Sequence, residues 1–382
     1  MWSKQQGNKT TNANRFKPRS GFLSSDNFPA PAAFHRLITS SLSLLPAAFW
    51  CFLLSALLTS TAVAQSGAWK RQPTGSLAWL HAVFFLDQNR GWVVGSRGTF
   101  LATADGGATW QVKPRPAEDV LRDIYFVDEL NGWVVCERNV YDLKTKDEAR
   151  TYLMNTTDGG ANWKRVELSG VDVNARLIRA VFSPSGRGWA FGEGGAVYTS
   201  PEAGEKWVRI QLPTRHLILG GTFIDDYRGW LVGAGGTILQ TSDSGETWHL
   251  SALLDAKDVR FTATSFSDNR RGWAVGSGGS VYRTINGGRT WSAQTSGVAA
   301  DLLDVKFFDA FEGWAVGTDG TLIHTTDGGQ LWTAEQSGTT HPLERVFFAD
   351  RTHGWTVGFG GTILALVRAE APRLNRQTTS TP

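Results

Sequence analysis

A Gly-Trp pair recurs along the chain at a nearly constant spacing. Four of the six intervals between successive pairs are 41 residues, one is 43 and one is 56. A unit of this length is too short to bury a hydrophobic face alone, so the period indicates a repeat architecture in which neighbouring units supply each other's core. The pairs begin at Gly91, Gly132, Gly188, Gly229, Gly272, Gly313 and Gly354.

Each repeat contains four short segments with the residue pattern of β-strands. In the sixth repeat they cover residues 302–309, 313–317, 321–325 and 331–335, separated by Gly, Asp and Asn. Four antiparallel strands make one propeller blade. We therefore predict an all-β fold, a seven-bladed β-propeller with four-stranded antiparallel blades. The glycines of the G-x-x-G turns, such as Gly95 and Gly98, suit positions with positive φ.

An acidic turn with the pattern S/T-x-D-x-G-x-T-W closes most repeats and is typical of the Asp-box. We expect its Asp to bond nearby backbone N–H groups and its Trp to pack between blades. One carboxylate per turn falls short of the six to eight oxygens that calcium prefers, so we predict structural turns without a metal or cofactor. Six copies, some of them degraded, end at Trp110, Trp163, Trp207, Trp248, Trp291 and Trp332.

The seventh repeat lacks this turn, and its missing strand is found at the other end of the repeat region. Trp69 in WKRQPTG matches Trp291 in WSAQTSG. We predict that the strand around Trp69 pairs with residues 362–367. This pairing closes the ring and removes an exposed sheet edge.

Residues 1–64 lie outside the repeats. Six basic residues precede an apolar run over 42–58, and Ala-Val-Ala follows at 62–64, a pattern that predicts a signal peptide cleaved before Gln65. The alternative is a retained membrane anchor. We expect a propeller over 65–368, a disordered tail over 369–382, and a periplasmic or thylakoid-lumen-like location.

The 318 residues that remain after removal of this leader hold 32 basic and 34 acidic residues, which argues against a nucleic-acid partner.

The 56-residue interval places an insertion at 137–154, between the second and third strands of its blade. A charged insertion on a regular ring is either a tolerated excursion or a docking surface.

Basic residues cluster on the face that carries the G-x-x-G turns and the connections between blades. If the ring closes, several guanidinium groups converge on the channel mouth, where they could hold acidic protein segments. The alternative is that each arginine pairs separately with a neighbouring acid such as Asp123, Asp258 or Glu344. The candidate binding residues are Arg122, Arg179, Arg215, Arg260 and Arg345 near the first strands, with His81 and His216 beside them, and Arg97 and Arg138 in the turns.

Motifs for metalloprotease, hydrolase or nucleotide chemistry are absent from the sequence, and we predict that the protein is not an enzyme. Propellers with Asp-boxes include glycosidases, which use two carboxylates. Asp304 and Glu344 are the best acidic candidates for that role. A secreted glycosidase or glycan-binding propeller is therefore the alternative function.

The combination of GWAVG, G-G-x-[IV] and T-x-D-G-G-x-T-W behind a secretory leader resembles the photosystem II stability/assembly factor family, over about residues 66 to 368. The resemblance implies a non-enzymatic, extracytoplasmic scaffold that holds membrane-protein subunits during complex assembly through an arginine-rich patch and a blade insertion. It implies a protein partner and allows peripheral contact with the membrane. We expect a monomer.

Overall fold

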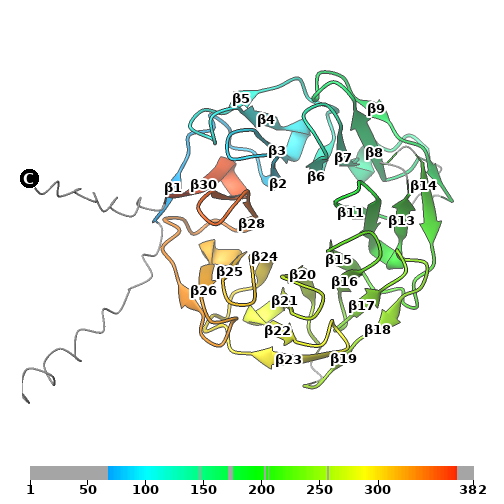
Figure 1. Ribbon diagram of the computed structural model, residues 1–382. Helices are drawn as coiled ribbons and strands as arrows, with labels where there is room; N and C mark the ends of the chain where they lie inside the picture. The colour runs from blue at the N-terminus through cyan, green and yellow to red at the C-terminus, as the bar shows by residue number, and fades with distance from the viewer. Residues whose placement is uncertain are drawn as a thin grey trace, which may run out of the picture. The chain divides into compact units, whose positions relative to one another are not determined.

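The computed structural model describes residues 68–145, 148–170, 175–201, 204, 206–255 and 258–367. The predicted signal peptide at 1–64 and the predicted tail at 369–382 lie outside these residues. The described residues form seven β-sheets arranged as a ring (Figure 1). Within the described ranges, no helix is long and apolar enough to span a membrane. The prediction of an all-β, seven-bladed propeller is confirmed.

The strands of each blade follow one another along the chain and pair antiparallel. Blade 1 contains β2 (Leu80–Phe85), β3 (Gly91–Gly95), β4 (Phe100–Thr103) and β5 (Gln111–Val112). Blade 2 contains β6 (Val120–Phe126), β7 (Gly132–Glu137), β8 (Thr151–Thr156) and β9 (Lys164–Arg165). Blade 3 contains β11 (Leu177–Phe182), β12 (Gly188–Gly192), β13 (Val197–Ser200) and β14 (Trp207–Ile210). Blade 4 contains β15 (Ile218–Phe223), β16 (Gly229–Gly233), β17 (Ile238–Thr241) and β18 (His249–Leu250).

The remaining blades repeat this order, and the first strand of every blade lies nearest the centre of the ring (Figure 1). Blade 5 contains β20 (Phe261–Phe266), β21 (Gly272–Gly276), β22 (Val281–Thr284) and β23 (Thr290–Gln294). Blade 6 contains β24 (Leu302–Phe307), β25 (Gly313–Gly317), β26 (Leu322–Thr325) and β27 (Thr333–Ala334). Blade 7 contains β28 (Leu343–Phe348), β29 (Gly354–Gly358), β30 (Thr362–Val367) and β1 (Ala68–Arg71). The short 3-10 turns are η2 (Ser96–Gly98), η3 (Val140–Asp142), η4 (Glu193–Gly195), η5 (Ser277–Gly279), η6 (Thr318–Gly320) and η7 (Phe359–Gly361).

Two blades carry a fifth strand, which the four-strand repeat pattern does not predict. The short strand β10 (Leu168–Ser169) pairs parallel with β14, and β19 (Ala252–Leu253) pairs parallel with β23. Both belong to the connection that enters the blade, which runs along the outer edge before turning inward. The extra strand covers an edge that would otherwise expose unpaired backbone groups.

The ring closes through the N-terminal strand, as predicted. Trp69 of β1 pairs with Leu366 of β30 in an antiparallel register. The Trp69 ring also meets the edge of Phe348 in β28, with centroids 5.9 Å apart. The strand that begins the described chain therefore completes the last blade.

The Gly-Trp pair builds the contact between one blade and the next. Trp273 of blade 5 stacks on Phe307 of blade 6 at 3.5 Å, and Trp332 of blade 6 meets the same ring edge-on at 5.7 Å. Both tryptophans belong to one buried cluster that spans the two blades. A Cβ atom on Gly313 would lie 2.5 Å from the Phe307 ring, so only glycine fits before the next tryptophan. The packing predicted for the acidic-turn tryptophans is seen for Trp332, which lies in this cluster, but the direct stack on the next blade is made by Trp273 of the Gly-Trp pair, for which none was predicted.

The two glycines of the G-x-x-G turn have different roles, which corrects the expectation that both adopt positive φ. Gly98 does so, at 66°, but Gly95 is extended at −167°. A side chain on Gly95 would meet the carbonyl oxygen of Trp79 at 2.2 Å. The other left-handed residue of the turn is Arg97, at 55°.

Backbone hydrogen bonds divide the turns between two faces. On one face, the 3-10 turns bond the connections between blades, as when Gly98 N–H donates to the Asp119 carbonyl at 2.7 Å. On the other, the acidic turns bond the first hairpins, as when Gly328 N–H donates to the Phe311 carbonyl at 2.8 Å. We call these the connection face and the acidic-turn face.

The acidic turns are held by their own hydrogen bonds. The Asp105 carboxylate accepts from the Thr109 backbone N–H at 2.9 Å and from the hydroxyls of Thr103 and Thr109. Bonds from Thr109 and Thr103 lower the pKa of Asp105 from 3.8 to about 2. Its oxygens are therefore occupied by the turn itself.

Candidate functional site

Every first strand carries a β-bulge at the same place, and these bulges build the connection-face end of the channel. In blade 2 the register shifts between Leu121 and Asp123, which leaves Arg122 as the extra residue. A bulge re-aims the extra side chain, and here all seven of these residues line one cavity. The bulged residues are His81, Arg122, Ile178, Leu219, Thr262, Leu303 and Glu344.

The same cavity, of about 150 Å³, brings together four of the arginines singled out from the sequence. Arg122, Arg179, Arg260 and Arg345 line it and come from blades 2, 3, 5 and 7. We call this cavity and its rim the channel mouth. Residues far apart in the sequence meet there because the ring places every first strand around one axis (Figure 1).

A layer of charged residues lies one position beyond the bulges. Arg345 pairs with Asp123 at 3.3 Å, and Arg179 pairs with Asp304 at 3.4 Å. Each carboxylate also accepts a backbone N–H from the neighbouring blade, Ala180 for Asp123 and Val346 for Asp304. Burial raises the pKa of both carboxyls, and the Arg179 charge opposes that shift.

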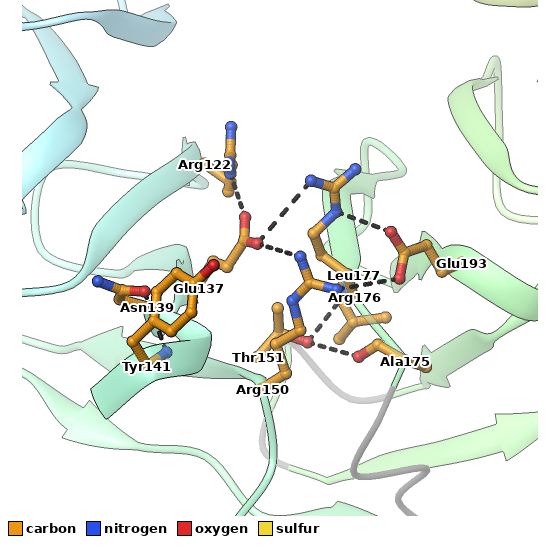
Figure 2. A network of polar contacts seen from close by, with 10 residues as sticks. All are labelled: Arg122, Glu137, Asn139, Tyr141, Arg150, Thr151, Ala175, Arg176, Leu177 and Glu193. Atoms are coloured by element: carbon orange, nitrogen blue, oxygen red, sulfur yellow. Dashed lines mark hydrogen bonds and ion pairs between the residues drawn. The ribbon is translucent and has the colours of Figure 1, made fainter. Parts of the chain in front are cut away.

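Arg122 joins a network between blades 2 and 3. Its Nε donates to the buried carboxylate of Glu137 at 2.5 Å (Figure 2). Arg150 bonds the other Glu137 oxygen at 3.0 Å, and both Arg150 and Arg176 form ion pairs with Glu193. Glu137 and Arg150 stand at the two ends of the insertion, so the network fixes the base of that loop (Figure 2).

The insertion lies where the sequence placed it, with a small difference in extent. The loop connects β7 to β8 and covers 138–150, because the last predicted insertion residues belong to β8. Arg138 donates to the Ala149 carbonyl at 2.8 Å across the base of the loop and lies over the Tyr152 ring. Its use as a docking surface stays a prediction.

Arg260 is the exposed arginine of the channel mouth. Asp258 is the neighbouring acid with which the alternative would pair it, but no ion pair of Arg260 occurs among the described residues. Arg122, Arg179 and Arg345 all have carboxylate partners, but not the acids beside them in the sequence, because Arg345 pairs with Asp123 and Arg179 with Asp304 across the channel. Three of the four arginines therefore form ion pairs within the protein. The guanidinium of Arg260 is available to bind a partner.

Glu344 lines the channel mouth and accepts a hydrogen bond from an aromatic neighbour. Trp79 Nε1 donates to its carboxylate at 2.8 Å. Burial raises the pKa of Glu344, and the bond from Trp79 opposes that shift. Burial, together with the Arg122 charge, lowers the pKa of His81 to about 3, so His81 is neutral near pH 7.

Three of the predicted arginines lie outside the cavity. Arg215 is exposed in the connection before β15 and precedes the bulged residue of that strand, Leu219. His216 beside it forms a hydrogen bond with Thr237. Arg97 lies in η2 and lines a different cavity of about 640 Å³. Arg138 points to Tyr152 in its own blade. Their contribution to binding stays a prediction.

The Asp304 charge adds to the rise that burial causes in the pKa of Glu344, the other acidic candidate for glycoside chemistry. Asp304 has both oxygens engaged, one by Arg179 and one by the Val346 N–H. Because both of its oxygens are engaged, Asp304 is poorly placed to act as an acid or a nucleophile. Within the described residues, no group of three or more His, Cys, Asp or Glu is placed to hold a metal.

The sequence that builds this ring matches a known family model. The model described as "Photosynthesis system II assembly factor YCF48" matches residues 61–149, 115–217, 199–298 and 292–367. The chain belongs to the YCF48 family. No curated protein is significantly similar to it in sequence.

Solved structures share the fold of this YCF48-family chain. YCF48 from Cyanidioschyzon merolae is 21% identical, with a TM-score of 0.62, over 78% of this chain and 98% of that one. A structure of YCF48 bound to D1 peptide is 20% identical, with a TM-score of 0.64, over 82% and 97%. A GH74 xyloglucanase from Xanthomonas campestris is 11% identical, with a TM-score of 0.59, over 78% of this chain and 53% of that enzyme.

Proposed function

We propose that the protein binds an acidic segment of a membrane-protein subunit at the channel mouth and acts as a non-enzymatic assembly scaffold. Membership of the YCF48 family supports this role, and a solved member of similar fold binds a D1 peptide. The observation that carries the proposal is the convergence of Arg122, Arg179, Arg260 and Arg345 from four blades on one cavity.

Arginine suits this task because its planar guanidinium binds a carboxylate with two parallel hydrogen bonds. Arg260 is exposed, so all of its guanidinium N–H groups can donate to a partner. The side chains of Arg122 and Arg176 keep 28% and 26% of their surface accessible, so they can add contacts without leaving their acids. The buried pairs below them hold the mouth in shape.

We propose that the scaffold works outside the cytoplasm, in a periplasm or a thylakoid-lumen-like compartment. The basic start, apolar run and Ala-Val-Ala sequence at 62–64 support export. In this proposal the leader covers 1–64, the propeller 65–368 and the tail 369–382, and the mature protein acts as a monomer.

The test compares two charge reversals on opposite faces. Detergent-solubilised membranes of the source organism are passed over the immobilised protein, its Arg260→Glu variant and its Arg270→Glu variant. Arg270 is exposed in a first hairpin on the acidic-turn face. We expect the wild type and Arg270→Glu to retain a membrane-protein subunit and Arg260→Glu to lose it. Equal recovery by all three proteins would overturn the proposal.

A further inference from the structure

Two exposed aromatic side chains stand beside the channel mouth. Trp79 is 40% exposed and Phe359 is 44% exposed, and their rings meet edge-to-face at 5.4 Å. His81 lies 5.5 Å from the Trp79 ring and His341 lies 5.3 Å from the Phe359 ring. We call these four residues the aromatic shelf. Exposed aromatic groups next to a polar site commonly mark a contact with a partner.

The shelf interrupts the repeat pattern. Phe359 opens η7, where the corresponding turns η2, η5 and η6 open with the polar residues Ser96, Ser277 and Thr318. Packing between blades does not require Phe359, because it is exposed and the other blades form without an aromatic residue there.

Trp79 takes a rim position that two other blades fill with arginine. It immediately precedes Leu80, which pairs with Gly95, and in blades 3 and 5 the equivalent residues are Arg176 and Arg260. Equivalent positions in the blades of a propeller lie at the same height along its central axis. A partner that reaches Arg260 across the mouth therefore meets Trp79 on the same rim.

Trp79 is held in place before any partner arrives. Its backbone N–H donates to the Ser96 hydroxyl at 3.1 Å, and its carbonyl accepts from the Ser96 N–H at 2.8 Å. Its indole N–H donates to Glu344 at 2.8 Å. A side chain that is already ordered loses little conformational freedom on binding, which favours its use as an anchor.

We propose that the aromatic shelf is an apolar subsite of the channel mouth and that it takes an aromatic side chain from the same segment whose carboxylates bind the arginines. The inference rests on the proposed function and adds the partner's chemistry, an acidic segment with an aromatic residue. His81, which lies beside the Trp79 ring, is neutral near pH 7, and one carboxylate oxygen of Glu344 is held by the Trp79 indole N–H. A wholly apolar partner fits less well, because it would cover guanidinium groups without pairing them.

The test uses two short labelled peptides of Glu, Ser and Gly, one with a central phenylalanine and one with alanine in its place. Fluorescence anisotropy measures the binding of each to the full chain. We expect the phenylalanine peptide to bind roughly tenfold tighter, as an aromatic contact of about 1.4 kcal/mol gives. Trp79→Ala abolishes this preference. Trp79→Phe, which keeps a ring but loses the bond to Glu344, retains most of it.

Phe311→Ala is the matched control, because Phe311 is 63% exposed on the acidic-turn face. It leaves the preference unchanged, and far-UV circular dichroism checks the fold of each variant. Equal affinity of the two peptides for the wild type, or a preference that survives Trp79→Ala, overturns the subsite and leaves the proposed function standing. Failure of both peptides to bind overturns the proposed function and the subsite together.

Discussion

Arg179 and Asp304 form an ion pair at 3.4 Å although their strands, β11 and β24, belong to the third and sixth blades of the ring. Arg345 and Asp123 likewise join blades 7 and 2 at 3.3 Å. All four residues lie just beyond the bulges of their strands, so their side chains meet inside the channel. These pairs form a floor below the channel mouth. A second cavity of about 230 Å³ on their other side also borders Arg179 and Arg345.

Removal of one charge from this floor should destabilise the fold. In Asp304→Asn, Arg179 loses its partner while it remains 12% exposed. Loss of one member of a buried pair costs about 3 to 5 kcal/mol. We expect the free energy of unfolding, measured by urea denaturation, to fall by that order. The exposed Asp258→Asn control should change it by about 0.5 kcal/mol or less. Equal effects of the two substitutions would show that the floor does not support the ring.

Closure of the ring can be tested at Trp69. Its side chain is 8% exposed and packs against Trp314 and Phe348. Trp69→Ala leaves a cavity at the junction of the first and last strands, and we expect a loss of about 4 kcal/mol in the free energy of unfolding. Phe311→Ala, on an exposed aromatic, should cost about 0.5 kcal/mol or less. If both variants unfold at the same denaturant concentration, the closing strand contributes no stability.

The acidic turns should make the protein sensitive to strong acid. Hydrogen bonds lower the pKa of Asp105 and Asp158 to about 2, from an ordinary value of 3.8. A carboxyl with a lowered folded pKa stabilises the protein above its unfolded pKa, and that stability is lost as the pH falls from about 4 to about 2. We expect thermal unfolding temperatures to fall over this range. The double variant Asp105→Asn/Asp158→Asn should show a shallower fall.

The fifth blade provides the natural control for that experiment. Asn286 replaces the acid there, and its side-chain oxygen still accepts from the Thr290 N–H at 3.0 Å. Asparagine therefore preserves the turn, and the double variant should unfold near the wild-type temperature at pH 7. An unchanged slope between pH 4 and 2 would mean that other carboxyls dominate acid unfolding.

The glycosidase alternative makes a separate prediction. The engaged oxygens of Asp304 argue against catalysis by this residue, and we expect no release of nitrophenol from aryl glycosides above a buffer blank. Activity that is abolished by Glu344→Gln or Asp304→Asn, with Asp258→Asn unaffected, would contradict a non-enzymatic role.

The sequence predicted the ring and its closure because those features depend on local, repeated patterns. Gly-Trp spacing gave the blade number, and the match between Trp69 and Trp291 located the closing strand. The fifth strands β10 and β19 were missed because each is two residues long in an irregular connection. No periodic signal marks such a segment.

The site was harder to predict because a bulge changes which residues face the channel. Arg122 is a bulged residue, Arg179 follows its bulge and Arg260 precedes its strand, yet all three look alike in sequence as arginines near a strand start. Pairing across the channel, as between Arg179 and Asp304, requires knowledge of the ring. Trp79 carried a usable signal, since it lies outside the tryptophan pattern.

The most direct test of binding at the channel mouth is site-specific photocrosslinking. A benzophenone amino acid is placed at Leu303, which lines the mouth, or at Leu331, which is 67% exposed beside an acidic turn on the other face. Each full-length protein is irradiated with detergent-solubilised membranes. We predict a crosslink to a membrane-protein subunit from position 303 and none from position 331. A crosslink from position 331 alone would contradict binding at the channel mouth.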